Sequence, residues 1–408
     1  MQIVVYLFII FTFLPYISFF NIGTISDVQP YSLLCSTIVI MIYLYKNNVF
    51  FKKNTLYFLI YNFFVITFLI YNSIYLNQLD ISDTVRGVIP YVSLALISIA
   101  SFISIQILKN DNVEKVIKIF YWLWVAVGTI QIFDQNALTF WRIRRVITDE
   151  RGVISLANEP SYFALHLILF TLILVIISDK NDKYKYITLA CCVLIAQNAV
   201  GVIYSGLLIL ILSKKRINAK QVFLTFSTIG ILFLLIIGYF KFNPNSRLVF
   251  LLSSIIFSGE TPIYLKDISL NIRFAHLYLS VKAFFLDFFL PHGVNSWKDY
   301  YVNEVIKNPN LFIEPLYRLN ISNGKIVTMI GSFLYEIGFL SFYYFYFFWN
   351  IVKTKKEMKK IGILILIFST NGLNLSNPLF CFLLGVLYYL YSIREKEVYG
   401  LQKKVVSL

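Results

Sequence analysis

Residues 159–178 read EPSYFALHLILFTLILVIIS, an apolar run whose only charged residue is at its start. A helix of about 20 residues is about 30 Å long, which matches the hydrocarbon core of a bilayer. The run therefore predicts a transmembrane helix. The whole chain has a similar character, because 58% of its 408 residues are hydrophobic and 14% are charged, against about a quarter charged in soluble domains. The composition predicts a polytopic membrane protein and excludes an ordinary soluble domain.

Further apolar runs divide the chain into segments long enough to span a membrane. One of them, 186–213, has a lysine cluster before it and Lys214, Lys215 and Arg216 after it. Because basic residues flank spans on the cytoplasmic side, this run is expected to cross twice as a short hairpin. Its polar tip is Gln197–Gly201. The other runs fall at 3–20, 30–45, 55–75, 87–108, 116–133, 159–178, 220–240, 326–349 and 361–393.

The last run, 361–393, has lysines before it and basic residues after it, so the same argument predicts a second hairpin with its turn at Asn371–Pro378. About twelve helices result, with both termini in the cytoplasm. The expected order is helices 1–5 in 1–133, an external arginine-rich loop in 134–158, helices 6–9 in 159–240, a long periplasmic loop containing short helices in 241–325, and helices 10–12 with a cytoplasmic tail in 326–408.

The arginines do not follow the lysines on this map. Most lysines fall in cytoplasmic segments, whereas all arginines except Arg216 and Arg394 fall in external ones: Arg86, Arg142, Arg144, Arg145, Arg151, Arg247, Arg273 and Arg318. A guanidinium group grips phosphate with two parallel hydrogen bonds and keeps its charge when partly buried. The distribution favours a site for a lipid pyrophosphate at the outer membrane face. The alternative is that individual arginines only meet nearby acidic residues or lipid phosphates.

The segment Trp141–Tyr162 carries the densest set of polar groups. Asn158-Glu159-Pro160 indicates a helix start, with Asn158 as the cap and Pro160 in the first turn. Glu159 then lies near a helix N-terminus at the outer face. Its carboxylate can complement the helix dipole alone, or it can orient or deprotonate an attacking sugar hydroxyl beside Arg151.

Other ionisable residues are weaker candidates. His166 follows Glu159 by about two helical turns, and a hydrogen-bonded core histidine is the preferred interpretation. His276 is three residues after Arg273 and is expected on the same helix face, and His292 lies in Pro291-His292-Gly293; either could transfer a proton near neutral pH. Glu336 falls inside an apolar run, where an ionisable group has a function or a structural hydrogen bond.

Several classes of cofactor and partner are not indicated. The chain has no Asp-x-Asp triplet, no His/Cys spacing suited to a metal and no Gly-rich nucleotide loop. We therefore expect no metal and no cofactor. The four cysteines lie in apolar runs and are interpreted as small core residues. The net charge of +15 is explained by the membrane map, so nucleic acid is not an expected partner.

Three segments together resemble the Wzy-type O-antigen polymerases of the polymerase and ligase superfamily. They are Arg151-Gly152 followed by Asn158–Ala164, Arg273 followed by Pro291–Asn295, and Ser332–Gly338. The order of helices, arginine-rich loop, hairpin, long external loop and final hairpin is also similar.

The resemblance implies a metal-independent glycosyltransferase with a GT-C-like fold in the bacterial inner membrane, its active site facing the periplasm. It would transfer a glycan from undecaprenyl pyrophosphate to the non-reducing end of another lipid-linked repeat unit. Arg151 and Arg273 match the family's pyrophosphate-binding arginines, and Glu159 matches its acidic residue, which completes the expected catalytic set. Substrate-binding roles are expected for Arg142, Arg145, Arg247, His276, His292 and Glu336.

The expected partners are the lipid-linked donor and acceptor, membrane lipid and a chain-length regulator protein. Two other functions remain open. An O-antigen ligase shares the donor and differs in acceptor; His292 does not match the position of the ligases' histidine, which favours a polymerase. A flippase or other transporter of lipid-linked oligosaccharide would carry its charges along a path at the membrane midplane, whereas the charges here gather in external loops.

Overall fold

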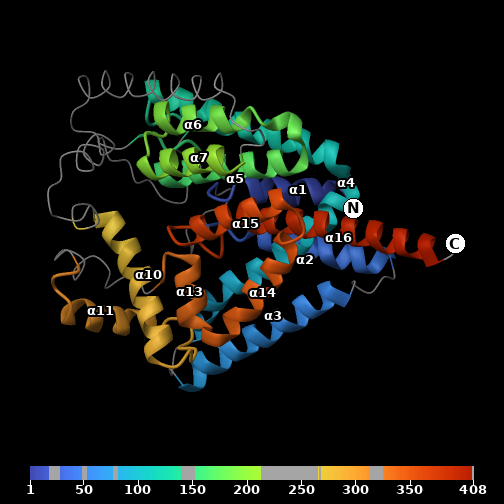
Figure 1. The fold of residues 1–408 in the computed structure, drawn as a ribbon. Coiled ribbons are helices and arrows are strands. Elements are labelled where there is room, and N and C mark those ends of the chain that lie inside the picture. The colour runs from blue at the N-terminus through green and yellow to red at the C-terminus, as the bar shows by residue number, and fades with distance from the viewer. Residues whose placement is uncertain are drawn as a thin grey trace. The chain divides into compact units, whose positions relative to one another are not determined.

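The computed structural model describes residues 1–17, 28–47, 53–76, 81–138, 152–212, 265, 268–312 and 325–406. These residues are mostly helical and contain no β-strand, as the sequence predicts for a helical membrane protein. The helices are α1 (Gln2–Phe13), α2 (Tyr31–Asn47), α3 (Lys53–Tyr71), η1 (Asn72–Leu76), α4 (Ile81–Phe133), α5 (Pro160–Ile177), η2 (Asp179–Asn181), α6 (Tyr184–Leu194), α7 (Ala199–Leu212), α10 (Ile268–Leu286), α11 (Trp297–Lys307), α13 (Met329–Glu336), η4 (Gly338–Leu340), α14 (Ser341–Val352), α15 (Lys356–Ser369) and α16 (Pro378–Val406) (Figure 1).

Within the described segments, three helical stretches are long and apolar enough to cross a membrane: Thr55–Tyr75, Ile81–Phe133 and Pro160–Ile177. The second is two helices joined at a kink, because Lys109 has φ 63° and ψ 158°, outside the helical region. This kink separates the two spans expected at 87–108 and 116–133. The run expected at 220–240 lies outside the described residues, as do large parts of both external loops.

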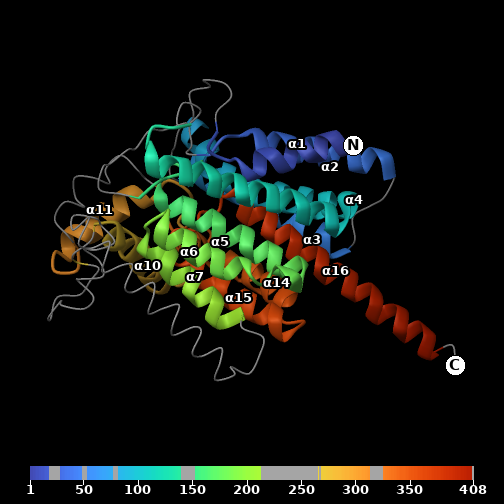
Figure 2. The same ribbon diagram turned by 90° about the horizontal axis from the view of Figure 1, so that it is seen from above.

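The chain divides into two compact units. The first contains residues 1–15, 20–116 and 268–408, and the second contains residues 16–19 and 117–267. In the first unit α1 packs against α2 and α16, α10 against α13 and α11, and α14 against α15 and α16. In the second unit α5, α6 and α7 pack against one another, side by side in both ribbon views (Figure 2).

Both runs that were expected to form hairpins are broken into two helices. In the second unit α6 ends at Leu194 and α7 begins at Ala199, so the run 186–213 is broken at its polar tip. In the first unit α15 ends at Ser369 and α16 begins at Pro378, with the asparagine-rich turn between them. The flanking lysines and polar tips therefore identified these two breaks correctly from sequence.

Two expected helices are shorter than their apolar runs. The run 3–20 gives α1, which ends at Phe13, because Pro15 disfavours a helical residue before it. The run 326–349 was expected to be one continuous helix, and this is wrong. It is broken into α13 and α14 at Gly338, whose φ is +51°. Hydropathy depends on side-chain polarity and does not report the backbone conformation at a glycine, so the break was not predicted.

Candidate functional site

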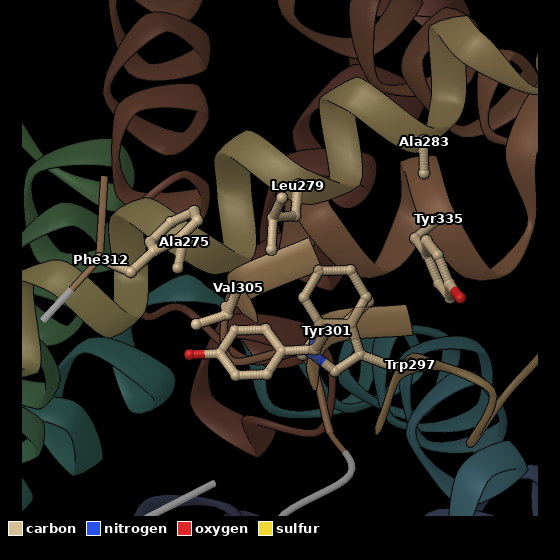
Figure 3. Packing of buried hydrophobic residues seen from close by; sticks show 9 residues of the cluster. Ala275, Leu279, Ala283, Trp297, Tyr301, Val305, Phe312 and Tyr335 are labelled. Atoms are coloured by element: carbon tan, nitrogen blue, oxygen red, sulfur yellow. The ribbon is translucent and has the colours of Figure 1, made fainter. Parts of the chain in front are cut away.

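The helices α10 and α11 form a small core that fixes the segment between them. Ala275, Leu279 and Ala283 are four residues apart, so they share one face of α10. In Figure 3 this face points toward side chains of α11. The buried cluster consists of Ala275, Leu279, Ala283, Trp297, Tyr301, Val305, Phe312, Ile326 and Tyr335. Small residues on α10 let the large rings approach closely, and the connection 287–296 is held at both ends.

This connection is joined to α13 by backbone hydrogen bonds. The His292 N–H donates to the Tyr335 carbonyl at 3.0 Å, and the Gly293 N–H donates to the Glu336 carbonyl at 3.0 Å. The last carbonyls of a helix lack partners within the helix, and the connection supplies them here. Two segments singled out in the sequence, Pro291–Asn295 and Ser332–Gly338, are therefore in direct contact.

His292 lies between a carboxylate and an aromatic ring. Its Nε2 is 2.9 Å from Asp287 Oδ2, and its Nδ1 is 3.3 Å from the Tyr335 carbonyl oxygen. The imidazole stacks on the Tyr335 ring with centroids 4.3 Å apart and an interplanar angle of 9°. Both ring nitrogens therefore lie within hydrogen-bond distance of an acceptor oxygen.

Glu336 is the last residue of α13 and is partly buried. The hydroxyl of Tyr91 donates to Glu336 Oε2 at 2.7 Å. Lys325 interacts electrostatically with Glu336, and its Nζ is 3.5 Å from the Arg86 carbonyl oxygen. We call Arg86, Tyr91, Lys325 and Glu336 the Glu336 cluster. Lys325 is its cation, whereas Arg86 contributes its backbone carbonyl and its guanidinium pairs with Asp83 Oδ1 at 3.8 Å.

The beginning of α4 also holds the connection. The side-chain amide of Asn295 donates to the Asp83 carbonyl, and a Cβ at Gly87 would lie 2.6 Å from Val294 Cβ. Only glycine allows this close approach. Residues 83–91, 291–295 and 332–338, far apart in sequence, therefore converge around Glu336.

Arg273 and His276 were expected on one face of α10, yet they meet different neighbours. The Arg273 guanidinium approaches the α15–α16 turn: its Nε lies 3.4 Å from where a Cβ at Gly372 would stand. Gly372 has φ +104°, which side-chain-bearing residues rarely adopt. Among the described residues, no carboxylate lies within ion-pair distance of Arg273.

His276 is a buried structural residue. Its Nδ1 accepts a hydrogen bond from the Val327 N–H at 3.0 Å, and its ring meets those of Trp297 and Tyr301 edge to face. Burial lowers the pKa of His276 from 6.5 to about 3. The neutral ring is therefore the form that this packing holds, and the expectation of a substrate-binding role gains no support from its position.

In the second unit, Glu159 begins α5. It is the N-cap residue, with φ −145° and ψ 154°, and Pro160 occupies the first helical position. The expectation that Asn158 is the cap is wrong by one residue, because proline forces the residue before it into the extended region. The Ser161 hydroxyl donates to Glu159 Oε2 at 3.2 Å. No cation in the described part of the chain forms an ion pair with Glu159.

His166 is a core histidine, as preferred from sequence. It is fully buried, its Nδ1 is 2.8 Å from the Tyr162 carbonyl oxygen, and its ring stacks on Trp124 at 4.7 Å. Arg142, Arg145, Arg151 and Arg247 lie outside the described residues, so the pairing expected between Glu159 and Arg151 is not described either. Within the described part of the chain, no group of three His, Cys, Asp or Glu side chains could hold a metal ion.

Sequence reasoning did not select Tyr91, Lys325, Asp287 or Tyr335, which surround Glu336 and His292. A weak signal existed for Tyr91, because a buried phenol needs a hydrogen-bond partner. Lys325, Asp287 and Tyr335 can be recognised only by their contacts with Glu336 and His292, and these contacts form only in the folded chain. A scan against protein-family models finds no match to this chain. A search of curated proteins finds no relative either.

Proposed function

We propose that this chain is an O-antigen or polysaccharide repeat-unit polymerase, a metal-independent glycosyltransferase of the GT-C type. It would have about twelve spans, with both termini in the cytoplasm and its site on the periplasmic face of a bacterial inner membrane. Its substrates would be undecaprenyl-pyrophosphate-linked glycans, one serving as donor and another as acceptor.

One observation carries this proposal. The segments Pro291–Asn295 and Ser332–Gly338 were selected by their resemblance to such polymerases, and they form backbone hydrogen bonds with each other around Glu336. A chance resemblance in two segments gives no reason for them to meet. Their contact, next to Lys325, supports a common role in binding an anionic, sugar-bearing substrate.

Arg273 supports the same function through its chemistry. Its guanidinium is half-buried beside the α15–α16 turn and has no carboxylate partner among the described residues. A guanidinium held in this way is suited to a phosphate ligand. In the proposed reaction, Arg273 and Arg151 would stabilise the charge that develops on the departing pyrophosphate.

The proposed reaction transfers one glycosyl group. An acceptor hydroxyl oxygen attacks the anomeric carbon, the bond from that carbon to the phosphate oxygen breaks, and undecaprenyl pyrophosphate leaves with the bonding electrons. The hydroxyl proton passes to a base, which we propose is Glu159. Its half-buried carboxylate accepts a hydrogen bond from the Ser161 hydroxyl and forms no ion pair with the described residues.

The test is the glycan profile of a deletion strain complemented with wild type, Arg273→Lys, Arg151→Lys, Glu159→Gln or Glu336→Gln, at matched protein levels. Arg216→Lys, on the predicted cytoplasmic side, is the control for the arginine variants. Loss of one donor to a developing charge costs about 10² to 10³ in rate. We expect the deletion to leave lipid A core capped with a single repeat unit, and the first three variants to fail to restore the ladder.

Other profiles contradict the proposal in distinct ways. Bare core in the deletion strain would indicate a ligase or a flippase instead. A full ladder from both arginine-to-lysine variants would mean that two parallel hydrogen bonds to an anion are not required. If Arg216→Lys also failed to restore the ladder, the loss in the other arginine variants would be assigned to impaired folding and not to a lost phosphate contact.

A further inference from the structure

The end of α10 and the turn after it form an exposed apolar tip, residues 285–290. Phe285 and Leu286 are each 63% exposed, Phe288 is 83% exposed and Leu290 is 58% exposed. Single exposed apolar side chains are ordinary, but a contiguous group indicates an interaction surface. The tip belongs to the long loop that was expected to be external, and the contacts of the tip indicate how deep it reaches.

The backbone of the tip is held in an unusual conformation. Phe288 has φ 53° and Phe289 has φ 65°, in the left-handed region that bulky residues rarely adopt. Two hydrogen bonds maintain it: the Phe289 N–H donates to the Phe284 carbonyl at 2.7 Å, and the Leu290 N–H donates to the Asp287 carbonyl at 3.1 Å. The fold therefore maintains a strained turn that presents large apolar side chains outward.

The tip is attached to the beginning of α14. The Phe339 N–H donates to the Phe289 carbonyl at 2.8 Å, and the Phe342 ring contacts Phe284 and Phe289, with centroids 6.0 and 6.4 Å apart. On α14 the exposed side chains Phe342, Tyr346 and Trp349 are four and three residues apart, so they form one face. The exposed surface of the tip is continuous with this apolar face.

Contacts between α3 and α14 show where along the membrane normal the tip is attached. The helix α3 packs along α14, with the rings of Tyr61 and Tyr343 stacked at 3.8 Å and those of Phe58 and Phe347 at 4.6 Å. The Tyr61 hydroxyl also donates to the Leu340 carbonyl. Tyr61 belongs to the apolar stretch Thr55–Tyr75.

From Tyr61 to the outer end of that stretch there are 75 − 61 = 14 residues, or about 21 Å of helix. Leu340 is bonded to Tyr61, and its neighbour Phe339 is bonded to Phe289. Two hydrogen bonds and one peptide unit therefore connect Phe289 to Tyr61, and this distance is shorter than the distance from Tyr61 to the outer end of the stretch. The tip therefore lies alongside the apolar part of α3 and not beyond it.

We propose that the tip 285–290 is embedded in the hydrocarbon of the bilayer and is surrounded by lipid acyl chains. The external loop then re-enters the membrane at the end of α10. Asp287, the charged residue of the tip, is paired with His292 at 2.9 Å, which meets the need of a charged group at this depth for a partner. This inference does not depend on the polymerase function.

The experiment places a fluorophore at the tip in the full-length protein. Phe288→Cys is made in a Cys35→Ala background, since the other three cysteines are buried, and is labelled with an environment-sensitive dye in liposomes. Quenching is measured with lipids brominated on the acyl chain and with aqueous iodide. The controls are Phe63→Cys on the exposed apolar face of α3 and Lys298→Cys on the exposed polar face of α11.

We expect the Phe288 dye to behave like the Phe63 dye, with strong quenching by brominated lipid and several-fold weaker quenching by iodide than at Lys298. Iodide quenching equal to that at Lys298 would overturn the proposal, because the tip would be in water. Weak quenching by both agents would also overturn it, because protein would then cover the tip. If Phe288→Cys does not yield folded protein, Phe285→Cys carries the same outcomes.

Discussion

At the scale of single residues, the bond between Tyr91 and Glu336 is the contact whose removal is simplest to interpret. Tyr91→Phe keeps the ring and deletes the hydroxyl that donates to Glu336 at 2.7 Å. Leaving a partly buried carboxylate without this donor should lower the free energy of unfolding by about 1–3 kcal/mol. Thermal denaturation in detergent measures the loss, with Tyr45→Phe as the control because Tyr45 is 87% exposed. Equal losses in the two variants would contradict the prediction.

His276 predicts a dependence of stability on pH. Its pKa is lowered to about 3 in the folded protein and is about 6.5 when unfolded. The folded state then binds fewer protons between these values, so stability is full above pH 6.5 and falls as the pH drops toward 3. One group contributes a slope of at most about 1.4 kcal/mol per pH unit.

The measurement is the unfolding temperature at several pH values for wild type and His276→Asn. An asparagine oxygen can replace Nδ1 as the acceptor for the Val327 N–H, but it does not titrate. The variant should therefore show a shallower decline between pH 6.5 and 5. An identical decline in both proteins would assign the pH dependence to other groups.

Particular residues show what sequence predicts at this scale. His166 could be interpreted correctly, because a lone histidine in an unbroken apolar run must be packed and hydrogen-bonded. A structural hydrogen bond for Glu336 was one of the two expected explanations, and the bond exists. Its partner could not be predicted, because Tyr91 is 245 residues away and the contact depends on how α4 and α13 pack.

At the scale of elements, the break at Gly338 is the decisive feature of the last part of the chain. Gly338→Ala places a Cβ 2.4 Å from the Phe289 carbonyl oxygen at a φ of +51°. Backbone would have to move, so we expect a loss of several °C in unfolding temperature, or loss of folded protein. Fluorescence-detected gel filtration after heating measures it.

Gly206→Ala is the matched control. Gly206 lies in α7, and a Cβ there meets nothing within 4 Å. This variant should be neutral or more stable by up to about 1 kcal/mol, because alanine favours helix more than glycine. If both alanine variants behave alike, the conformation at Gly338 is not what holds α13 and α14 apart.

Helix boundaries could be predicted where charged or polar residues interrupt or flank the apolar runs. Lysines on both sides of 186–213 and 361–393 indicated a break in each run, and both breaks are present. The run that contains the break at Gly338 has one charged residue, Glu336, and no lysine cluster or polar tip, so the break was not predicted. The start of α5 was predicted to within one residue, and the error arose from giving the polar side chain of Asn158 more weight than the backbone restriction imposed by Pro160.

At the scale of the whole molecule, the predicted topology can be tested with two cysteines. Asn303→Cys on α11 is expected to react with a membrane-impermeant thiol reagent from the periplasm, and Lys356→Cys at the start of α15 only after the inner membrane is opened. Both positions are polar and lie outside the apolar runs. The reverse pattern would invert the topology, and the external arginines would then face the cytoplasm.

The hydrogen bonds that complete the broken helix have a consequence for biosynthesis. Residues 289–293 supply partners to Tyr335, Glu336 and Phe339, and they leave the ribosome before α13 is made. The helices α13 and α14 have 8 and 12 residues, too few for either to cross a bilayer alone. The nascent chain therefore presents the docking surface before the helices that need it emerge. A circular permutant that begins at residue 325 would reverse this order and deliver α13 to the translocon with no partner for its last carbonyls.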